Sequence, residues 1–360
     1  MNKNFIAFFI FSQLLTFCME TTAQVTGKIA AENTHEIASI RSDFFIQSVL
    51  DQRSGPDSAG LVFIRSDGKN STQKIALQSA TLTGIIKFFT KSNSINTSRR
   101  PLRVRIQECN IRETLSGDRV LGQATVMLVF DLIKDSASIP LTQYQSTARY
   151  NRPLKDLRIA ELTLGRLLNN SLKFIDSWME TEARRNPHLA RGVSLTFRDY
   201  RDQHDDTVYY TPMRPLVWDD FREKRSDSKF AASVFPSFGY DQATKIDNGI
   251  IHVELALKVF VVKSASWVGP GTRSHYNLEH EQKHFDLVRL IAERFKLKLV
   301  SENLTPDNFQ GIINFEYLEF YREMNRIQRE YDEQTSHGLS PVAQETWNRK
   351  IETELKLLDL

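Results

Sequence analysis

The chain has 360 residues, which at roughly 150 residues per domain is enough for about two domains, each with its own hydrophobic core. Hydrophobic residues make up 41% and charged residues 25%, values that exclude a wholly disordered chain, a collagen-like repeat and a membrane protein with many spans. The 47 basic and 44 acidic side chains leave a net charge of +3, which is too small over this length to indicate a nucleic-acid partner. We therefore expect a globular protein that binds no nucleic acid.

Residues 1–23 predict a cleaved signal peptide. A short polar start with one lysine precedes the mostly apolar residues 5–17, and Thr21 and Ala23 place small side chains before the cleavage point. The apolar run of 13 residues is shorter than the roughly 17 to 25 that span a bilayer, so we expect no transmembrane anchor in the mature chain. Lipid anchoring through Cys18 is the less favoured alternative, because a bulky ring precedes that cysteine. The sequence thus predicts an exported protein, periplasmic or extracellular.

Residues 24–182 predict an α+β domain in which helices cover one side of a small sheet. Apolar and basic residues alternate over 102–106, and 123–133 is a second β-like run, so both are expected to be strands. Residues 157–179 carry apolar side chains at helical spacing and predict a helix that packs across this sheet. Cys109, which has no disulfide partner in the mature chain, is interpreted as a strand residue. The sequence assigns this domain no catalytic residues, no role and no partner.

Residues 183–215 are rich in Arg, Asp, Asn and Pro, and we interpret them as a connector between two domains. Residues 216–360 then form the second predicted domain. Two β-like runs, 232–240 and 250–263, come first in it, and the sequence after them has a helical pattern to the end of the chain. This order also predicts an α+β fold.

The sequence His-Glu-Gln-Lys-His at residues 280–284 has the HExxH pattern of zinc hydrolases. On a helix, His280 and His284 are one turn apart and project from the same face, so both imidazoles can bind one Zn²⁺ ion. Glu281 is then placed to act as general base on a water molecule at the metal. The histidine face continues at helical steps with the apolar residues Leu287, Val288, Ile291, Phe295 and Leu299, which indicates an inward face. The competing interpretation is a pair of hydrogen-bonded core histidines without metal.

A catalytic zinc site needs a third protein ligand. The continuation found in metzincins, with a glycine and a third histidine close behind the motif, is absent after His284, so the ligand comes from another element. Pro306 suits the first turn of a second helix that extends to about Glu333. We expect the two helices to form an antiparallel hairpin centred near Asn303.

Four residues are candidates for the third ligand. The hairpin arithmetic places Glu319 and Glu323 opposite the motif. Asp332 and His337 lie farther along and reach the metal only if the chain after the second helix folds back. The residues alone leave this choice open.

The second domain resembles a bacterial family of predicted secreted zinc-dependent proteases, the domain of unknown function 922 family, over residues 216–357. The matching residues are Trp218, Asp219 and Phe221, the stretch HEQKHFD at 280–286, the stretch YDEQTSHG at 331–338, and Trp347. The resemblance implies a zincin-like domain of strands followed by three helices, the first of which carries HExxH. It also implies that the stretch at 331–338 completes the zinc site.

This resemblance favours His337 as the third ligand. Asp332 is the alternative, as a ligand or as a hydrogen-bond partner of a ligand, and Glu323 is less favoured. Tyr331 is a candidate donor to a developing oxyanion. Trp218 and Phe221 are interpreted as core residues beside a turn, and Asp219 is expected to cap that turn.

Two functions are consistent with these residues. The preferred one is an exported zinc metallopeptidase that acts on a peptide or protein substrate, with Glu281 as general base. The alternative is a non-catalytic binding or assembly protein of the cell envelope, in which the metal only stabilises the helical hairpin. A site with an open coordination position favours the first, and a closed site with four protein ligands favours the second.

Overall fold

The computed structural model describes residues 23–24, 43–54, 61–65, 72–76, 78–91, 99–200, 204–224 and 230–358. The signal peptide predicted at 1–23, apart from its last residue, and the alternative anchor Cys18 lie outside the described residues. The chain divides into two compact units, Met1–Thr181 and Glu182–Leu360. Each unit combines strands with helices, which confirms the predicted α+β class.

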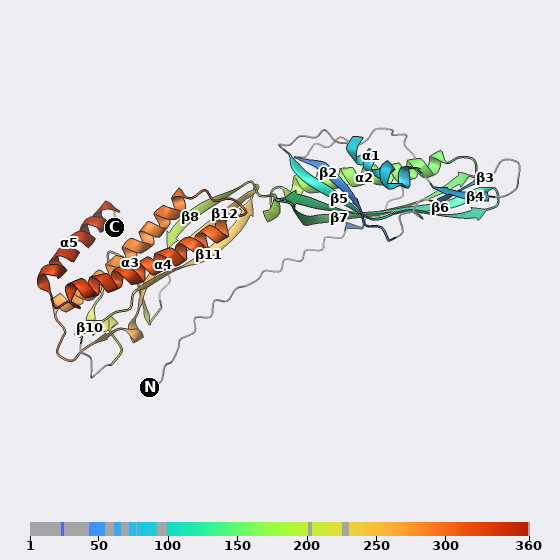
Figure 1. Cartoon of the computed structure of the whole chain (residues 1–360). Coiled ribbons are helices and arrows are strands. Elements are labelled where there is room, and N and C mark those ends of the chain that lie inside the picture. The colour runs from blue at the N-terminus through green and yellow to red at the C-terminus, as the bar shows by residue number, and fades with distance from the viewer. Residues whose placement is uncertain are drawn as a thin grey trace. The chain divides into compact units, whose positions relative to one another are not determined.

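The first unit is built on a five-stranded sheet with the strand order β1-β7-β6-β5-β2 (Figure 1). Its three long strands, β5, β6 and β7, are antiparallel neighbours. Side chains alternate between the two faces of a strand, and in β5 the apolar Leu102, Val104 and Ile106 are fully buried, as the sequence pattern predicts. The strands are β1 Ala23–Gln24, β2 Phe44–Asp51, β5 Arg100–Ser116, β6 Arg119–Lys134 and β7 Ala137–Pro153, with a separate hairpin of β3 Leu61–Arg65 and β4 Thr72–Ala76.

Two helices, α1 Leu82–Lys91 and α2 Arg158–Glu182, lie on one side of this sheet (Figure 1). The long helix α2 was predicted at 157–179, and its buried stripe packs on the sheet: the Tyr144 hydroxyl of β7 donates to the carbonyl of Leu167 at 3.2 Å. Cys109 is a buried residue of β5, and burial raises the pKa of its thiol to about 12. The cysteine is therefore a strand residue, as predicted, and it belongs to the core.

A buried ion pair fastens the β3-β4 hairpin to this sheet. Arg152 and Glu113 have completely buried side chains and lie 2.7 Å apart. Both also contact the backbone of Phe63 in β3: Glu113 accepts from its N–H at 2.7 Å, and Arg152 donates to its carbonyl at 2.6 Å. Burial works to raise the pKa of Glu113, but hydrogen bonds from Arg152 and Tyr150 hold that pKa below its ordinary value.

We expect Glu113→Ala to lower the free energy of unfolding of this unit by about 3 to 5 kcal/mol, because it leaves the Arg152 guanidinium buried and unpaired. The control is the pair between Arg198 and Glu254, whose side chains are 53% and 47% exposed at a distance of 2.8 Å. There Glu254→Ala should cost less than about 1 kcal/mol. Urea unfolding of the full chain, with each variant compared with wild type on the transition of its own unit, measures both values. Similar small losses of unfolding free energy in the two variants would contradict the stabilising role of the buried Arg152–Glu113 pair.

The second unit contains a sheet of the order β11-β12-β8, with β9 also paired to β12. The prediction that 183–215 is a connector is wrong, because β8 and β9 come from this segment and pair with β12. Most residues of β8 are only partly buried, so the strand carries a weak apolar alternation and was missed. The strands are β8 Gly192–Asp199, β9 Thr207–Tyr209, β11 Ser237–Asp247 and β12 Ile250–Val262, with a separate pair of β10 Ala232–Ser233 and β13 Trp267–Val268.

Three helices follow the strands, as predicted, and the first carries HExxH: α3 His275–Ser301, α4 Phe309–Thr335 and α5 Pro341–Leu357. The second helix begins at Phe309, three residues after Pro306, because Asn308 accepts a hydrogen bond from the Thr305 N–H at 2.7 Å and closes a turn before the helix. The pair between Arg294 and Glu323 places the centre of the α3-α4 hairpin near residue 308 instead of 303. This small shift decides which residues of α4 face the motif.

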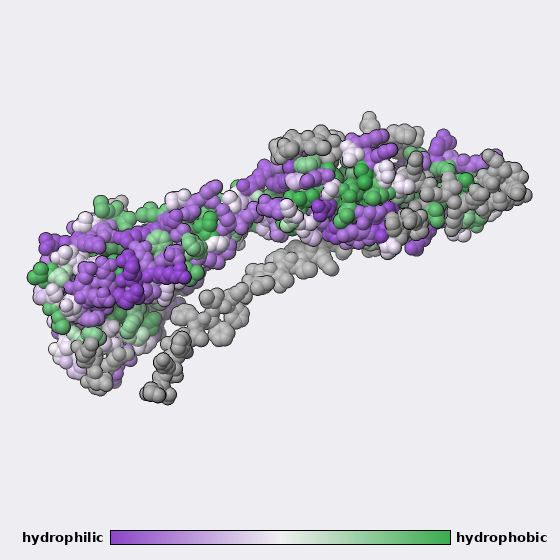
Figure 2. Space-filling model, viewed as in Figure 1, coloured by the Kyte–Doolittle hydropathy of each residue, from purple (hydrophilic) through white to green (hydrophobic). Residues whose placement is uncertain are grey.

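Helix α3 packs between the sheet and the other two helices. Phe295 of α3 contacts Phe238 of β11 and Phe320 of α4, each with ring centroids 6.0 Å apart, and Lys283 of α3 pairs with Glu352 of α5 at 3.2 Å. The side of α4 that faces the viewer in Figure 2 is mostly hydrophilic, as expected for a helix with one buried face. Among the described residues, no helix is long and apolar enough to cross a membrane.

Candidate metal centre

The HExxH motif lies in the second and third turns of α3, close to the start of the helix. Ser274 caps this helix by accepting a hydrogen bond from the Asn277 N–H at 3.1 Å. His280 and His284 are 6% and 7% exposed and project from the same face, with ring centroids 4.9 Å apart. The inward orientation predicted from the apolar stripe is therefore the one observed.

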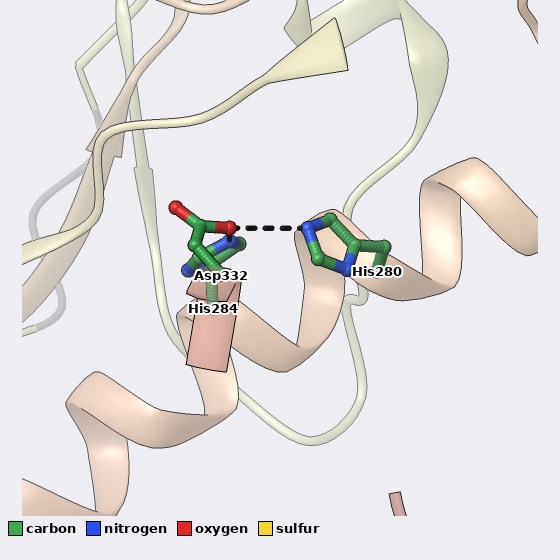
Figure 3. Close-up of side chains that lie close together, drawn as sticks. All are labelled: His280, His284 and Asp332. Atoms are coloured by element: carbon green, nitrogen blue, oxygen red, sulfur yellow. Dashed lines mark hydrogen bonds and ion pairs between the residues drawn. The ribbon is translucent and has the colours of Figure 1, made fainter. Parts of the chain in front are cut away.

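Three side chains converge at this face: His280 and His284 from α3 and Asp332 from the last turns of α4 (Figure 3). The Nε2 atoms of His280 and His284 lie 3.4 Å and 2.9 Å from Oδ1 of Asp332. One nitrogen or oxygen from each residue lies within 4.8 Å of the others. This triad has the composition and spacing of a metal-binding site.

The separations in the triad can be compared with those of a bound ion. Zinc binds imidazole nitrogen and carboxylate oxygen at about 2.0 to 2.2 Å, so two ligand atoms of a tetrahedral site lie about 3.3 to 3.5 Å apart. The His280 to Asp332 distance of 3.4 Å matches this value, and the His284 to Asp332 distance of 2.9 Å needs a widening of about 0.5 Å. The three residues therefore fit a divalent transition metal with little rearrangement.

Asp332 supplies a negative charge at the centre of the triad. Burial works to raise the pKa of Asp332, but hydrogen bonds and charges from His280 and His284 outweigh it and hold that pKa well below its ordinary value. Burial works to lower the pKa of His284, and Asp332 reverses the effect, so the pKa is raised. Asp332 is thus ionised at neutral pH and available as an anionic ligand.

Glu281 is the neighbour of the triad in the sequence but not a member of it. Its side chain is 4% exposed, and its Oε2 atom accepts a hydrogen bond at 2.9 Å from the backbone N–H of Val234, which follows β10. Burial raises the pKa of Glu281 above its ordinary value. A carboxylate held in place with a raised pKa is suited to take up a proton.

A cavity of about 410 Å³ opens in front of these residues. One wall is made by the triad and Glu281, and the segment 230–237, α4, Asn277 and residues 337–338 line the rest of it. Apart from the triad, Glu281 and His337, the lining side chains are uncharged: Phe230, Ala231, Ala232, Ser233, Val234, Phe235, Pro236, Ser237, Asn277, Tyr321, Met324, Asn325 and Gln328. The triad thus faces a space that can hold a small molecule or a short peptide segment.

His337, the favoured third ligand in the sequence, lies at the rim of this cavity. It is outside the triad, with Nδ1 3.7 Å from the same Asp332 oxygen and a side chain that is 46% exposed. Its ring packs on Phe230 at a centroid distance of 4.4 Å. The predicted return of the chain occurs, because Ser336, His337 and Gly338 adopt left-handed backbone angles and end α4. The structure gives the third position to Asp332, which the sequence ranked second.

Two other expectations are corrected by the structure. Glu323 is not near the motif, because the shifted hairpin pairs it with Arg294 at 3.0 Å. Tyr331 does not face the cavity as an oxyanion donor, because it is fully buried and its hydroxyl donates to the carbonyl of His280 at 3.3 Å. Its ring instead stacks on His280 with centroids 4.8 Å apart, so Tyr331 supports the histidine from behind.

Residues 218–221, the first stretch that resembles the domain of unknown function 922 family, lie against α3, which carries the HExxH motif. Trp218 and Phe221 pack on each other at 5.0 Å, as predicted for core anchors. The cap is Asp220 instead of Asp219, since Asp220 accepts from the Val217 N–H at 3.0 Å. Just before it, the backbone N–H of Leu216 donates to Gln282 of the motif at 2.8 Å. The tertiary structure thus brings together two segments that the sequence could only place in order.

Sequence reasoning missed the side chains behind the triad. The Nδ1 atom of His280 contacts Oε1 of Gln344 at 2.8 Å, and Nδ1 of His284 contacts Oε1 of Gln328. Gln328 is on α4 and Gln344 is on α5, so neither is a neighbour of the motif in the sequence. A glutamine carries no metal-ligand signal, and only its position in the fold shows its role.

The comparisons with known proteins assign this chain to no family. No protein-family model matches it, and no curated protein matches it. A solved structure from Xanthomonas campestris, of a protein in the domain of unknown function 330 family, is 14% identical with a TM-score of 0.26, and the match covers 41% of this chain and 90% of that chain. A similarity at this level supports no conclusion about function. The resemblance to the domain of unknown function 922 family stays a prediction.

Proposed function

We propose that the second unit is a zinc-dependent hydrolase of peptide bonds, in a protein exported from the cytoplasm. The observation that supports this most directly is that the triad and Glu281 line the same cavity. The donor set of two imidazoles and one carboxylate is one that zinc accepts in catalytic sites, where a fourth position stays open. When bound, zinc would polarise a substrate carbonyl and lower the pKa of a water molecule to about 7.

In this proposal each residue of the motif has a separate task. His280, His284 and Asp332 hold the ion. Glu281 accepts the proton of the attacking water and later transfers it to the leaving amine. The hydrogen bond from the Val234 N–H leaves Glu281 with one fixed oxygen, so the carboxylate is already oriented before substrate binds. Orientation of this kind reduces the entropy cost of the proton transfer.

The cavity lining indicates the kind of substrate. Outside the catalytic groups and His337 it contains hydroxyl, amide, aromatic and aliphatic side chains but no lysine or arginine and no further acid. Burying a charged substrate side chain against such a lining would leave the charge unpaired, at a cost of several kcal/mol. We therefore propose that residues beside the cleaved bond are uncharged.

The alternative function, a binding or envelope-assembly protein with a structural metal, is favoured by one observation. His337 lies beside Asp332, with its Nδ1 atom 3.7 Å from Oδ1, close enough to become a fourth ligand after a small movement. Four protein ligands would close the site to water. The two functions therefore differ in a measurable property, which is whether the bound ion keeps an open position.

The test of the proposal is metal-dependent cleavage of a diverse peptide library by the purified full chain. We expect about one Zn²⁺ per chain, cleavage next to uncharged residues, loss of cleavage on treatment with a chelator, and recovery on adding zinc. The double variant His280→Ala/His284→Ala is the control and should bind no zinc at this site and cleave nothing. Cleavage by that variant would identify a contaminant. A zinc-loaded protein that cleaves no peptide would favour the structural role.

A further inference from the structure

His280 is connected from behind to a chain of buried amide side chains on α5. Gln344 is 1% exposed and Asn348 is 6% exposed. Gln344 Oε1 lies 2.8 Å from Nδ1 of His280, Gln344 Nε2 donates to Asn348 Oδ1 at 2.8 Å, and Asn348 Nδ2 donates to Oε1 of Glu279 at 3.0 Å. These hydrogen bonds lead from His280 on α3 through Gln344 and Asn348 on α5 to Glu279, the residue before His280 on α3.

The chemistry of these groups allows only one direction of donation. A carboxylate accepts hydrogen bonds and cannot donate them, so Asn348 must present its NH₂ group to Glu279 and its oxygen to Gln344. Gln344 must then present its NH₂ group to Asn348, which leaves its oxygen facing His280. An amide oxygen only accepts, so Nδ1 of His280 must carry the hydrogen. The tautomer of His280 is therefore determined by Glu279, through two intervening amides.

Tyr331 strengthens the same assignment. The hydroxyl of Tyr331 accepts from Nε2 of Gln344 and donates to the backbone carbonyl of His280 at 3.3 Å. Both hydrogens of the Gln344 amide are then used, one on Tyr331 and one on Asn348, so a flip of the amide would break both bonds. Because these groups are buried, breaking each bond carries the full desolvation cost of an unpaired polar group.

We propose that Glu279, Asn348 and Gln344 are positioning residues that fix His280 in the Nδ1–H tautomer, with the lone pair of Nε2 directed at the metal site. Nε2 is the atom that faces Asp332, so a ring in the other tautomer would present a hydrogen where a ligand atom is needed. Hydrogen bonds at the second nitrogen of a metal-binding histidine are worth about 10- to 100-fold in metal affinity. The inference rests on the metal site and is independent of peptide hydrolysis.

His284 is oriented by a shorter version of the same arrangement. Nε2 of Gln328 donates to the backbone carbonyl of His284 at 3.5 Å, so the Gln328 oxygen faces Nδ1 of His284. This second glutamine comes from α4. The two histidines of the motif are thus oriented by two different helices, and α5, which contributes no ligand to the triad, is needed for His280.

The test compares zinc affinity in three variants of the full chain, measured by competition with a chelator of known affinity. Gln344→Met keeps the length of the side chain but removes the acceptor, and we expect zinc affinity to fall by about 10- to 100-fold. Asn348→Leu does not touch His280 and should weaken zinc binding by a smaller factor, because Tyr331 alone then holds the Gln344 amide in its orientation. Gln344→Glu restores an acceptor facing His280 and should bind zinc more tightly than Gln344→Met.

The control is Thr346→Ala, on the exposed side of the same helix, which should leave zinc affinity unchanged. A second measurement reads the tautomer directly: ¹⁵N NMR of histidine-labelled, zinc-free wild type under alkaline conditions should show neutral His280 with its hydrogen on Nδ1. The His280→Ala variant identifies its signals. Hydrogen on Nε2, wild-type affinity in a folded Gln344→Met variant, or equal losses in Gln344→Met and Gln344→Glu would each overturn the inference. Each of these results is obtained whether or not the protein cleaves peptides.

Discussion

Replacing Asp332 with alanine should remove tight zinc binding from the protein, whereas replacing His337 should not. Asp332 supplies the oxygen that lies 3.4 Å and 2.9 Å from the two histidine nitrogens, and His337 lies outside this triad. Removing a metal ligand should cost more zinc affinity than removing a residue that only hydrogen-bonds to a ligand. We therefore expect Asp332→Ala to weaken zinc binding by more than about 100-fold. His337→Ala should weaken it by less than about 10-fold. Chelator competition on the full-length variants measures both values.

The control variant for this comparison is Glu330→Ala, two residues from Asp332 on α4, where the acid forms an exposed pair with Arg326 at 2.9 Å. Zinc affinity should stay at the wild-type value in this variant. A loss in His337→Ala as large as that in Asp332→Ala would mean that the bound ion draws His337 into a four-ligand site. That outcome would contradict our ligand assignment and favour the structural role of the metal.

Glu281→Gln should abolish hydrolysis while the protein keeps its zinc. The amide preserves the shape of the side chain, and its oxygen can still accept the hydrogen bond from Val234, but it cannot take up a proton. Proton transfer by a positioned group contributes about 10² to 10⁴ in rate, so kcat should fall by at least that factor. Zinc content and cleavage of a peptide selected from the library are measured on the same preparation.

Glu345→Gln is the matched control, because Glu345 is exposed on α5 and the change is chemically identical. It should retain wild-type kcat. If Glu281→Gln cleaves peptides at the wild-type rate with zinc bound, another group accepts the proton and the proposed role of Glu281 is wrong. If Glu281→Gln instead loses zinc, Glu281 holds the metal, directly or through the fold.

Some features of the site and the fold could be predicted from short stretches of the sequence. The HExxH helix could be predicted because its two histidines are one turn apart on any α-helix, and the apolar stripe that continues their face indicated burial. The alternation at 102–106 predicted part of β5 for the same reason, since side-chain direction follows from the period of the backbone. In each case the information lies within a few residues of the sequence.

The third ligand depended on how two helices pair over about 50 residues, and here the local signals were insufficient. A turn closed by Asn308 moved the hairpin centre by about five residues, which took Glu323 to Arg294 and brought Asp332 to the histidines. The strand β8 was missed because its pairing with β12 stabilises it more than its own weak pattern suggests.

The sequence by itself determined the motif, its helix, the inward face of the histidines, the α+β class and the presence of a second helix behind the first. Only the tertiary structure decided that Asp332 completes the triad, that Glu281 accepts a hydrogen bond from Val234, and that Gln344 of α5 contacts His280. The physical reason is that an α-helix repeats every 3.6 residues, or 5.4 Å, so the directions of its own side chains follow from their spacing in the sequence. How separate elements meet depends on turns and packing that no single segment encodes.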